Sequence, residues 1–138
     1  MEHLEHLLSF PELDMPAINQ VELHPLCAQH RTRAYCAEKG IVVQAYSSMG
    51  QGAADLLDNS EVMLISEKHS IQPSQVLLLW ALQQGIPVIP KSTNPERMRS
   101  NLLVDPPASE TVLDDGDMET LNALDRDHHF CWNPEKVL

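Results

Sequence analysis

The sequence lacks any apolar run that approaches the roughly 18 residues of a transmembrane helix. Its first ten residues, MEHLEHLLSF, carry acids and histidines where a signal peptide needs a basic region and a long apolar core. We therefore expect a protein that is not secreted and that has no membrane partner.

Cysteine is also scarce. The three cysteines, Cys27, Cys36 and Cys131, form no CxxC pair and leave an odd count, so neither a disulfide framework nor a zinc framework is expected. If Cys27 and Cys36 share a helix, a rise of about 1.5 Å per residue separates them by roughly 13 Å, beyond the roughly 7 Å limit for bridging. This cysteine usage indicates a reducing compartment, and we expect a cytoplasmic protein.

Basic residues are few, because 9 Lys and Arg stand against 20 Asp and Glu and give a net charge of −11. The global field repels nucleic acid, so we expect no nucleic-acid partner. Any anion site must be a local concentration of positive charge. The 138 residues, 43% of them hydrophobic, have the composition of one globular domain, spanning residues 1–138.

Two apolar, β-branched runs, residues 41–46 and 86–90, predict strands that are buried on both faces of a parallel sheet. A third candidate strand, residues 17–23, is interrupted by polar residues. Helical segments with proline near the start and glycine just past the end precede the two strong runs, at residues 25–39 and 73–84. This alternation predicts an α/β fold with a parallel sheet and right-handed crossovers.

Other helices are expected along the chain. One spans residues 61–69 with Asp58 as its cap. Another follows Asp114 and carries apolar residues on one face: Met118, Leu121 and Leu124. The apolar run 76–82 predicts a helix that is buried on all sides. Three strands are too few for a complete (β/α)₈ barrel, which needs about 250 residues, so we expect the chain to be part of a larger fold.

The densest functional signal follows the last predicted strand. Three of the nine basic residues fall within nine positions there: Lys91, Arg97 and Arg99. Asn94 or Thr93 can cap a helix that starts at Pro95, which leaves free N–H groups and the positive end of the helix dipole beside a strand end. The pattern predicts an anion site, and the alternative is a solvated helix start with incidental ion pairs.

A second set of polar residues follows the strand at residues 41–46. The ring of Tyr46 can stack on a flat heterocycle, and the serine hydroxyls and glycine turn after it can approach a ligand closely. The alternative is an ordinary strand that ends in a polar turn, because the segment lacks the spacing of a GxGxxG loop.

Taken together, these segments resemble the aldo-keto reductase superfamily. The resemblance rests on the following stretches, in the family's order and spacing: NQVELHP at 19–25, the 40–46 run, the 73–80 segment, IPKS at 89–92, PER at 95–97 and LDR at 124–126. It covers nearly the whole chain and corresponds to the C-terminal half of the family. It implies a partial (β/α)₈ TIM barrel with the last three parallel strands, their helices and the C-terminal extra helices.

The resemblance implies an NADP (NADPH) cofactor, whose nicotinamide end would meet four residues. Gln20 matches the strand residue that hydrogen-bonds the carboxamide, and Tyr46 matches the aromatic residue that stacks on the nicotinamide ring. Ser47 and Met49 match positions on the pyrophosphate or ribose side.

The adenosine end is implied by five further matches. Lys91, Ser92 and Thr93 match the segment at the 2′-phosphate. Arg97 matches the residue that packs against the adenine or grips that phosphate, and Asn101 matches an adenine contact. A 2′-phosphate needs local positive charge, whereas a bare 2′-hydroxyl usually meets a carboxylate.

Parts of the family pattern are missing. Nothing in the chain resembles the acid/base tetrad of Asp, Tyr, Lys and His, and Tyr46, Lys91 and His24 do not replace it. The Ser-Asn pair that holds the carboxamide is also absent, and Ser100 stands where many members have a glutamate at the adenine amino group. We expect no catalytic residue in this chain, and no activity from it alone, because carbonyl reduction needs a positioned proton donor.

The C-terminal segment invites a metal hypothesis because it contains His128, His129 and Cys131, with His3 and His6 as further candidates. Nothing in the spacing fixes a tetrahedral set, so we expect no metal. Phe130 and Trp132 either line a substrate pocket or pack in the interior.

Two hypotheses for function remain. The first is a fragment of an NADP-dependent aldo-keto reductase that carries the cofactor-binding half, with a carbonyl substrate, and either the missing N-terminal half-barrel or a second copy as partner. The second is a noncatalytic interaction module that docks through open strand edges. Either way, side chains of the barrel interior are expected to be exposed: Val43, Ala45, Val88 and Ile89.

Overall fold

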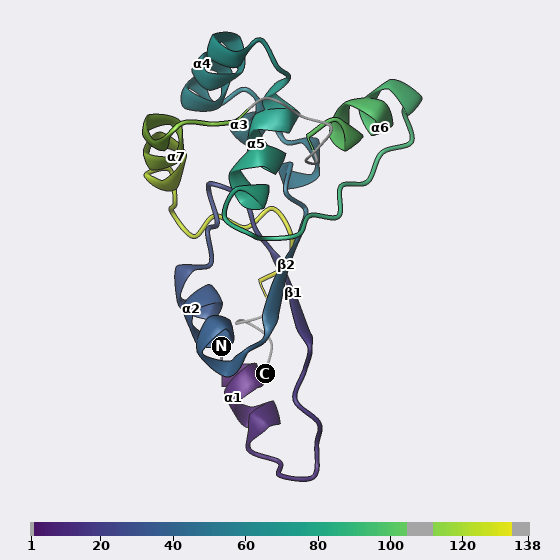
Figure 1. Ribbon diagram of the computed structural model, residues 1–138, viewed down its shortest axis with the longest axis vertical. Helices are drawn as coiled ribbons and strands as arrows, with labels where there is room; N and C mark the ends of the chain where they lie inside the picture. Colours follow the sequence, from purple (N-terminus) through teal and green to yellow (C-terminus); the bar gives the residue numbers. More distant parts are fainter. Residues whose placement is uncertain (1, 105–111, 134–138) are drawn as a thin grey trace.

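The computed structural model describes residues 2–104 and 112–133. The two strands β1 (Ile18–Glu22) and β2 (Val42–Tyr46) pair in parallel, with Ile18 opposite Val42 and Glu22 opposite Tyr46. Figure 1 shows that helices α3 to α7 gather beyond the carboxyl ends of these strands, while α1 lies toward their amino ends. The predicted α/β class with a small parallel sheet is confirmed.

The third predicted strand is reduced to one bridge, in which Val88 pairs in parallel with Ala45 of β2. The Ala45 N–H donates to the Pro87 carbonyl (2.8 Å), and the Ile89 N–H donates to the Ala45 carbonyl (3.2 Å). Pro87 and Pro90 have no N–H group, so a longer ladder cannot form here. The order β1, β2 and Val88 is nevertheless that of consecutive neighbours in a parallel sheet.

Helix α2 (His30–Lys39) connects the two strands and begins five residues later than predicted. The delay arises because His24 and Cys27 form a tight turn, in which the Cys27 N–H donates to the His24 carbonyl (2.8 Å). Cys27 therefore lies outside the helix, contrary to the premise of the spacing argument. Cys27, Cys36 and Cys131 are all free thiols, as expected.

The chain after β2 forms a 3₁₀ turn, η1 (Gly50–Gly52), and the helices α3 (Ala54–Leu57) and α4 (Ser60–His69). The cap of α4 is Asn59 and not Asp58: the Asn59 side chain accepts from the N–H groups of Glu61 (3.0 Å) and Val62 (3.4 Å). Asp58 instead ends α3, so one residue separates the predicted cap from the observed one.

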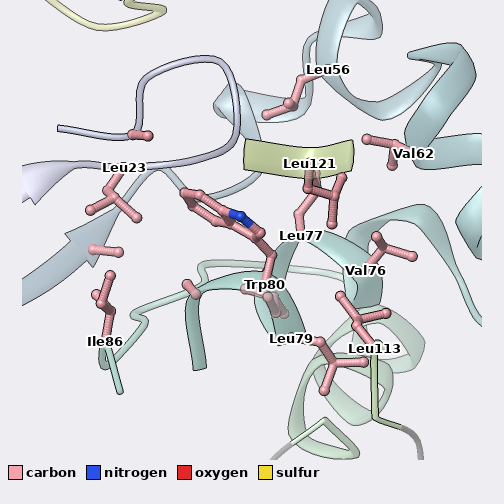
Figure 2. Packing of buried hydrophobic residues seen from close by; sticks show 14 of the residues in the cluster. Leu23, Leu56, Val62, Val76, Leu77, Leu79, Trp80, Ile86, Leu113 and Leu121 are labelled. Carbon is pink, nitrogen blue, oxygen red and sulfur yellow. The ribbon is translucent and has the colours of Figure 1, made fainter. Parts of the chain in front are cut away.

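Helix α5 (Pro73–Leu82) is the centre of the hydrophobic core, and its six residues from Val76 to Ala81 are all buried, as predicted. Trp80 is fully buried, and its indole N–H donates to Asn122 Oδ1 (2.9 Å) at the end of α7 (Asp115–Asn122). Figure 2 shows the Trp80 ring between Leu23 of the sheet side and Leu121 of α7. Burial of one such aromatic ring contributes about 1.5–3 kcal/mol.

Helix α7 begins at the predicted cap, Asp114, whose carboxylate accepts from the Asp117 N–H (3.0 Å). An ionic contact joins α7 to α4, because Lys68 donates to Asp114 (2.6 Å) and Asp117 (2.7 Å). His69 also meets Asp117 (2.6 Å). Burial alone raises the pKa of Asp117, but hydrogen bonds from Lys68 and His69 bring that pKa below its usual range.

Helices α1 (Glu2–Leu8) and α6 (Pro95–Leu102) bury none of their residues. Figure 1 shows α6 on the side of α5 that faces away from α7, and the Gln75 side chain of α5 donates to the Ser100 carbonyl of α6 (3.1 Å). No helix within residues 2–104 and 112–133 combines the length and apolar character that crossing a bilayer requires.

The sheet leaves apolar side chains on the surface. Ile89 is 43% exposed, as expected, and Ile18 and Val42 are 53% and 49% exposed. The expectation is wrong for Ala45, which is fully buried because the 87–89 backbone pairs against it. Val43 and Val88 are partly buried and pack against the core.

Candidate functional site

A cavity of about 1190 Å³ opens where β2 ends, between the 89–92 segment, the start of α5 and one side of α6. Seven of the nine predicted cofactor residues line it: Tyr46, Ser47, Met49, Lys91, Ser92, Arg97 and Asn101. The structure therefore brings together residues that lie up to 55 positions apart in the sequence (101 − 46 = 55). The cavity lies at the carboxyl ends of parallel strands, where open α/β sheets and barrels bind ligands.

Gln20 and Thr93 lie elsewhere. Gln20, in the middle of β1, lines a second cavity of about 270 Å³ and donates from Nε2 to Gln44 Oε1 (2.9 Å) on the neighbouring strand. Thr93 is exposed and is not among the residues that line either cavity.

Tyr46 is the residue that the two cavities share. It ends β2 opposite Glu22 of β1, so its ring stands at the rim of the sheet. Burial raises the pKa of Tyr46, and the neighbouring Cys131 and Glu22 raise it further, so its hydroxyl stays neutral at ordinary pH. A neutral ring between two cavities can stack on a flat group that reaches from one into the other.

Two serine hydroxyls on the larger cavity have no hydrogen-bond partner among the described residues. The Oγ atoms of Ser47 and Ser48 are both buried from solvent and unpaired. Ser47 also holds a left-handed backbone conformation, with φ of 53°. Because a buried polar group without a partner costs about 1–3 kcal/mol, this turn fits a ligand that supplies acceptor oxygens.

The positive charge of the cavity comes from Lys91 and Arg97, both exposed. Neither side chain forms an ion pair within the part of the chain that the structure describes, although Asp58 and Glu96 line the same cavity. Two exposed cations that meet no carboxylate partner among the described residues can close on a phosphate group. The cluster therefore supplies local positive charge on a chain whose net charge is −11.

Two of the N–H groups that were expected to be free at the start of α6 already donate to a side chain of this chain. Asn94 is the cap, and its Oδ1 accepts from the N–H groups of Glu96 (2.8 Å) and Arg97 (3.2 Å). Helix capping thus competes with any anion for these donors. An anion at this place depends mainly on the side chains of Lys91 and Arg97.

The sequence analysis missed a buried polar cluster around Glu22. This carboxylate is 2% exposed and accepts from the N–H groups of Phe130 (2.9 Å) and Cys131 (3.2 Å), which anchors the C-terminal segment to β1. Burial raises its pKa, yet these donors and His24 lower it below its usual range. The signal that could have indicated it is the acid Glu22 in the run NQVELHP, directly before Leu23 and His24, which are both buried.

Phe130 packs in the interior. Its ring lies 5.2 Å from the ring centre of His24 and 4.7 Å from that of His128. A Cβ atom built on Gly50 would approach the Phe130 ring to 2.7 Å, so the ring fills the space that this glycine leaves. Trp132 is 67% exposed and borders the smaller cavity, beside Gln20.

A statistical description of the Aldo/keto reductase family matches residues 1–126. The chain belongs to the aldo/keto reductase family. The predicted resemblance is thus confirmed, and it extends over nine-tenths of the chain.

Known relatives agree with this assignment. The chain is 44% identical over 133 residues to an aldo-keto reductase of Mycobacterium sp. (strain MCS), covering 95% of this chain and 45% of that protein. It is 38% identical to the glyoxal reductase of Bacillus subtilis, covering 100% of this chain and 48% of the relative. The chain therefore spans less than half the length of these curated relatives.

A solved structure extends the comparison to the fold. A mutant of Gox0644 in complex with NADPH superposes with a TM-score of 0.86 at 35% identity, covering 99% of this chain and 48% of that chain. The family and its α/β architecture are thus shared along nearly the whole sequence.

Proposed function

We propose that this chain is the cofactor-binding half of an NADP-dependent aldo-keto reductase, a partial (β/α)₈ barrel that supplies the last three strand units. The complete enzyme would transfer hydride between NADPH and an aldehyde or ketone. The coverage of relatives, below one half, supports a partial barrel, and the neighbour order β1, β2 and Val88 is the order that a barrel requires.

One observation carries the cofactor assignment. Ser47 and Ser48, whose buried hydroxyls are unpaired among the described residues, line the same cavity as the two cations Lys91 and Arg97. Hydroxyl donors at one place and positive charges at another suit a long ligand with several phosphate groups. The residues present therefore fit a phosphorylated dinucleotide.

The choice of NADP over NAD rests on charge. Lys91 supplies a point charge and Arg97 a planar fork, and both suit a 2′-phosphate better than a 2′-hydroxyl. Ser92 and Asn101 line the cavity beside them and can add neutral hydrogen bonds. The related structure that binds NADPH supports the same choice.

The remaining contacts would orient the reactive ring. NADPH supplies the hydride when it is bound. Tyr46 would stack against its nicotinamide from the junction of the two cavities, and Gln20 would hold the carboxamide from β1. The proton that a carbonyl oxygen needs must come from a donor outside the matched residues, which we assign to the missing N-terminal half-barrel.

The missing half also accounts for the exposed sheet. Ile18, Val42 and Ile89 are each more than 40% exposed, and the strand edges offer unpaired backbone groups. A closed barrel has no edges and fills its interior with such side chains. We therefore propose the N-terminal half-barrel as the partner, with self-association as its substitute when the chain is alone.

Sedimentation velocity with a hydrophobic dye tests this assignment. The chain alone is expected to be either an oligomer or a loosely packed, dye-binding species, since apolar patches beyond a few hundred Å² are seldom bare on monomers. Adding a polypeptide that carries the first five barrel strands should give a compact heterodimer and abolish dye binding. A compact monomer with a sharp cooperative melt and no dye binding would contradict the proposal and favour an independent interaction module.

A further inference from the structure

Three possible metal ligands meet where the C-terminal segment crosses the turn after β1. Cys27 Sγ lies 3.6 Å from His129 Nε2, and His129 Nε2 lies 3.4 Å from Asp127 Oδ1. All three ligand atoms lie within 4.8 Å of one another. The sequence analysis grouped His129 with His128 and Cys131. The fold instead places His129 beside Cys27, which lies 102 positions before it, and beside Asp127.

The two measured separations match a tetrahedral ion. Zinc binds sulfur at about 2.3 Å and nitrogen or oxygen at about 2.0–2.1 Å, which at tetrahedral angles places sulfur about 3.6 Å from nitrogen and nitrogen about 3.4 Å from oxygen. The three ligand atoms are thus close enough to share one ion, but Cys27 Sγ also lies 3.8 Å from His129 Nδ1, so a side-chain rotation must bring the sulfur opposite Nε2.

Glu22 orients the imidazole for this task. Its Oε2 lies 3.0 Å from His129 Nδ1, while the N–H groups of Phe130 and Cys131 hold the same carboxylate in place. A proton on Nδ1 that is donated to Glu22 leaves the lone pair of Nε2 free to bind a cation. A buried carboxylate behind a histidine is the arrangement that fixes metal-binding imidazoles.

The local charge also favours a cation. The carboxylates of Glu22, Asp127 and Asp125 all lie near Cys27 and give this place a negative field. That field attracts a divalent cation to the place where the three ligand atoms meet. Binding such an ion exchanges the thiol proton for the metal, and the proton leaves to solvent.

We propose that Cys27, Asp127 and His129 form a zinc-type metal site with a fourth position open to water. The side chain of Asp127 is 81% exposed, so an ion can enter from solvent, whereas Cys27 lies on the buried side. Such an ion would tie the turn after β1 to the C-terminal segment. Asp127 and His129 line the smaller cavity together with Gln20, but Lys91 and Arg97 take no part in the metal site, so metal binding can be measured without NADPH.

Titration of the full 138-residue chain with Co²⁺ tests the proposal, because cobalt replaces zinc and reports thiolate ligation by a near-ultraviolet charge-transfer band. We expect one Co²⁺ per chain, the charge-transfer band, visible bands of tetrahedral intensity, and displacement by Zn²⁺. Cys27→Ser should remove the charge-transfer band. Asp127→Asn, at an exposed side chain that can be changed without disturbing the core, should weaken Zn²⁺ binding at least about tenfold.

Cys131→Ser is the matched control, because Cys131 belongs to the same segment but is not one of the three ligands. It should leave the band and the affinity unchanged. Absence of the band in the parent chain, its loss in Cys131→Ser, or unchanged Zn²⁺ affinity in Asp127→Asn would each overturn the site. These results would leave the assignment of the larger cavity to NADPH unchanged.

Discussion

Purified alone, the 138-residue chain should oxidise no NADPH above a buffer control when a simple aldehyde is present. The reason is the absent proton donor: none of the residues that match the family corresponds to its acid/base tetrad. General acid–base catalysis contributes about 10²- to 10⁴-fold, and our proposal assigns the proton donor to the N-terminal half-barrel. The measurement is NADPH absorbance in a steady-state assay at high enzyme concentration.

Activity should return when the chain is mixed with the unmatched N-terminal portion of a relative, such as the glyoxal reductase of Bacillus subtilis. Tyr46→Phe should keep most of the restored rate, since our account gives Tyr46 a stacking role that its hydroxyl does not serve. Steady aldehyde-dependent oxidation by the chain alone, lost in Tyr46→Phe, would show that Tyr46 is the catalytic acid and that our assignment is wrong.

Lys91→Ala should weaken NADPH binding about tenfold to a hundredfold and leave NADH binding nearly unchanged. A charge-assisted hydrogen bond of about 1.5–3 kcal/mol is lost only when a 2′-phosphate is present to receive it. Dissociation constants for both cofactors, measured in the chain or in the reassembled barrel, give the comparison.

Arg99→Ala is the matched control for this change. Arg99 is an exposed cation two residues after Arg97, yet it does not line the larger cavity. Arg99→Ala also removes one positive charge, from the neighbouring helix α6, so any general electrostatic loss should appear in this variant too. Equal losses for NADPH and NADH in Lys91→Ala, or the same selective loss in Arg99→Ala, would remove Lys91 from the 2′-phosphate site.

Much of the fold could be predicted from local patterns. The buried helix α5 follows from its continuous apolar run, and the Asp114 cap follows from an acid that precedes the apolar face of α7. Both depend on interactions within a few residues. Strand β2 could be predicted for the same reason, because a β-branched run after Gly40 has few alternatives.

The errors came from contacts that neighbouring residues do not reveal. Helix α2 starts late because the backbone of His24 pairs with that of Cys27. The third strand is reduced to Val88 because the flanking prolines have no N–H group to donate to a ladder. The prolines are visible in the sequence, but the prediction gave more weight to the apolar character of the run. The choice between Asp58 and Asn59 as cap turned on one residue, which lies within the usual uncertainty of helix ends.

The candidate site also combines features that are visible in the sequence with contacts that only the fold creates. The basic cluster at Lys91 and Arg97 was evident from charge alone, and the resemblance supplied the role that we propose for Tyr46. The unpaired hydroxyls of Ser47 and Ser48 could not be foreseen, because burial depends on the whole fold. Nor could the approach of His129 to Glu22, which are 107 positions apart.

The most direct test of the central claim, that this chain holds the cofactor, is a fluorescence titration of NADPH into the reassembled barrel. We predict saturable binding of one NADPH per chain, tighter than that of NADH and reversed by 2′,5′-ADP, a competitor that carries the 2′-phosphate without the nicotinamide. A compact, reassembled barrel that binds no NADPH, or that binds NADPH without displacement by 2′,5′-ADP, would contradict the account.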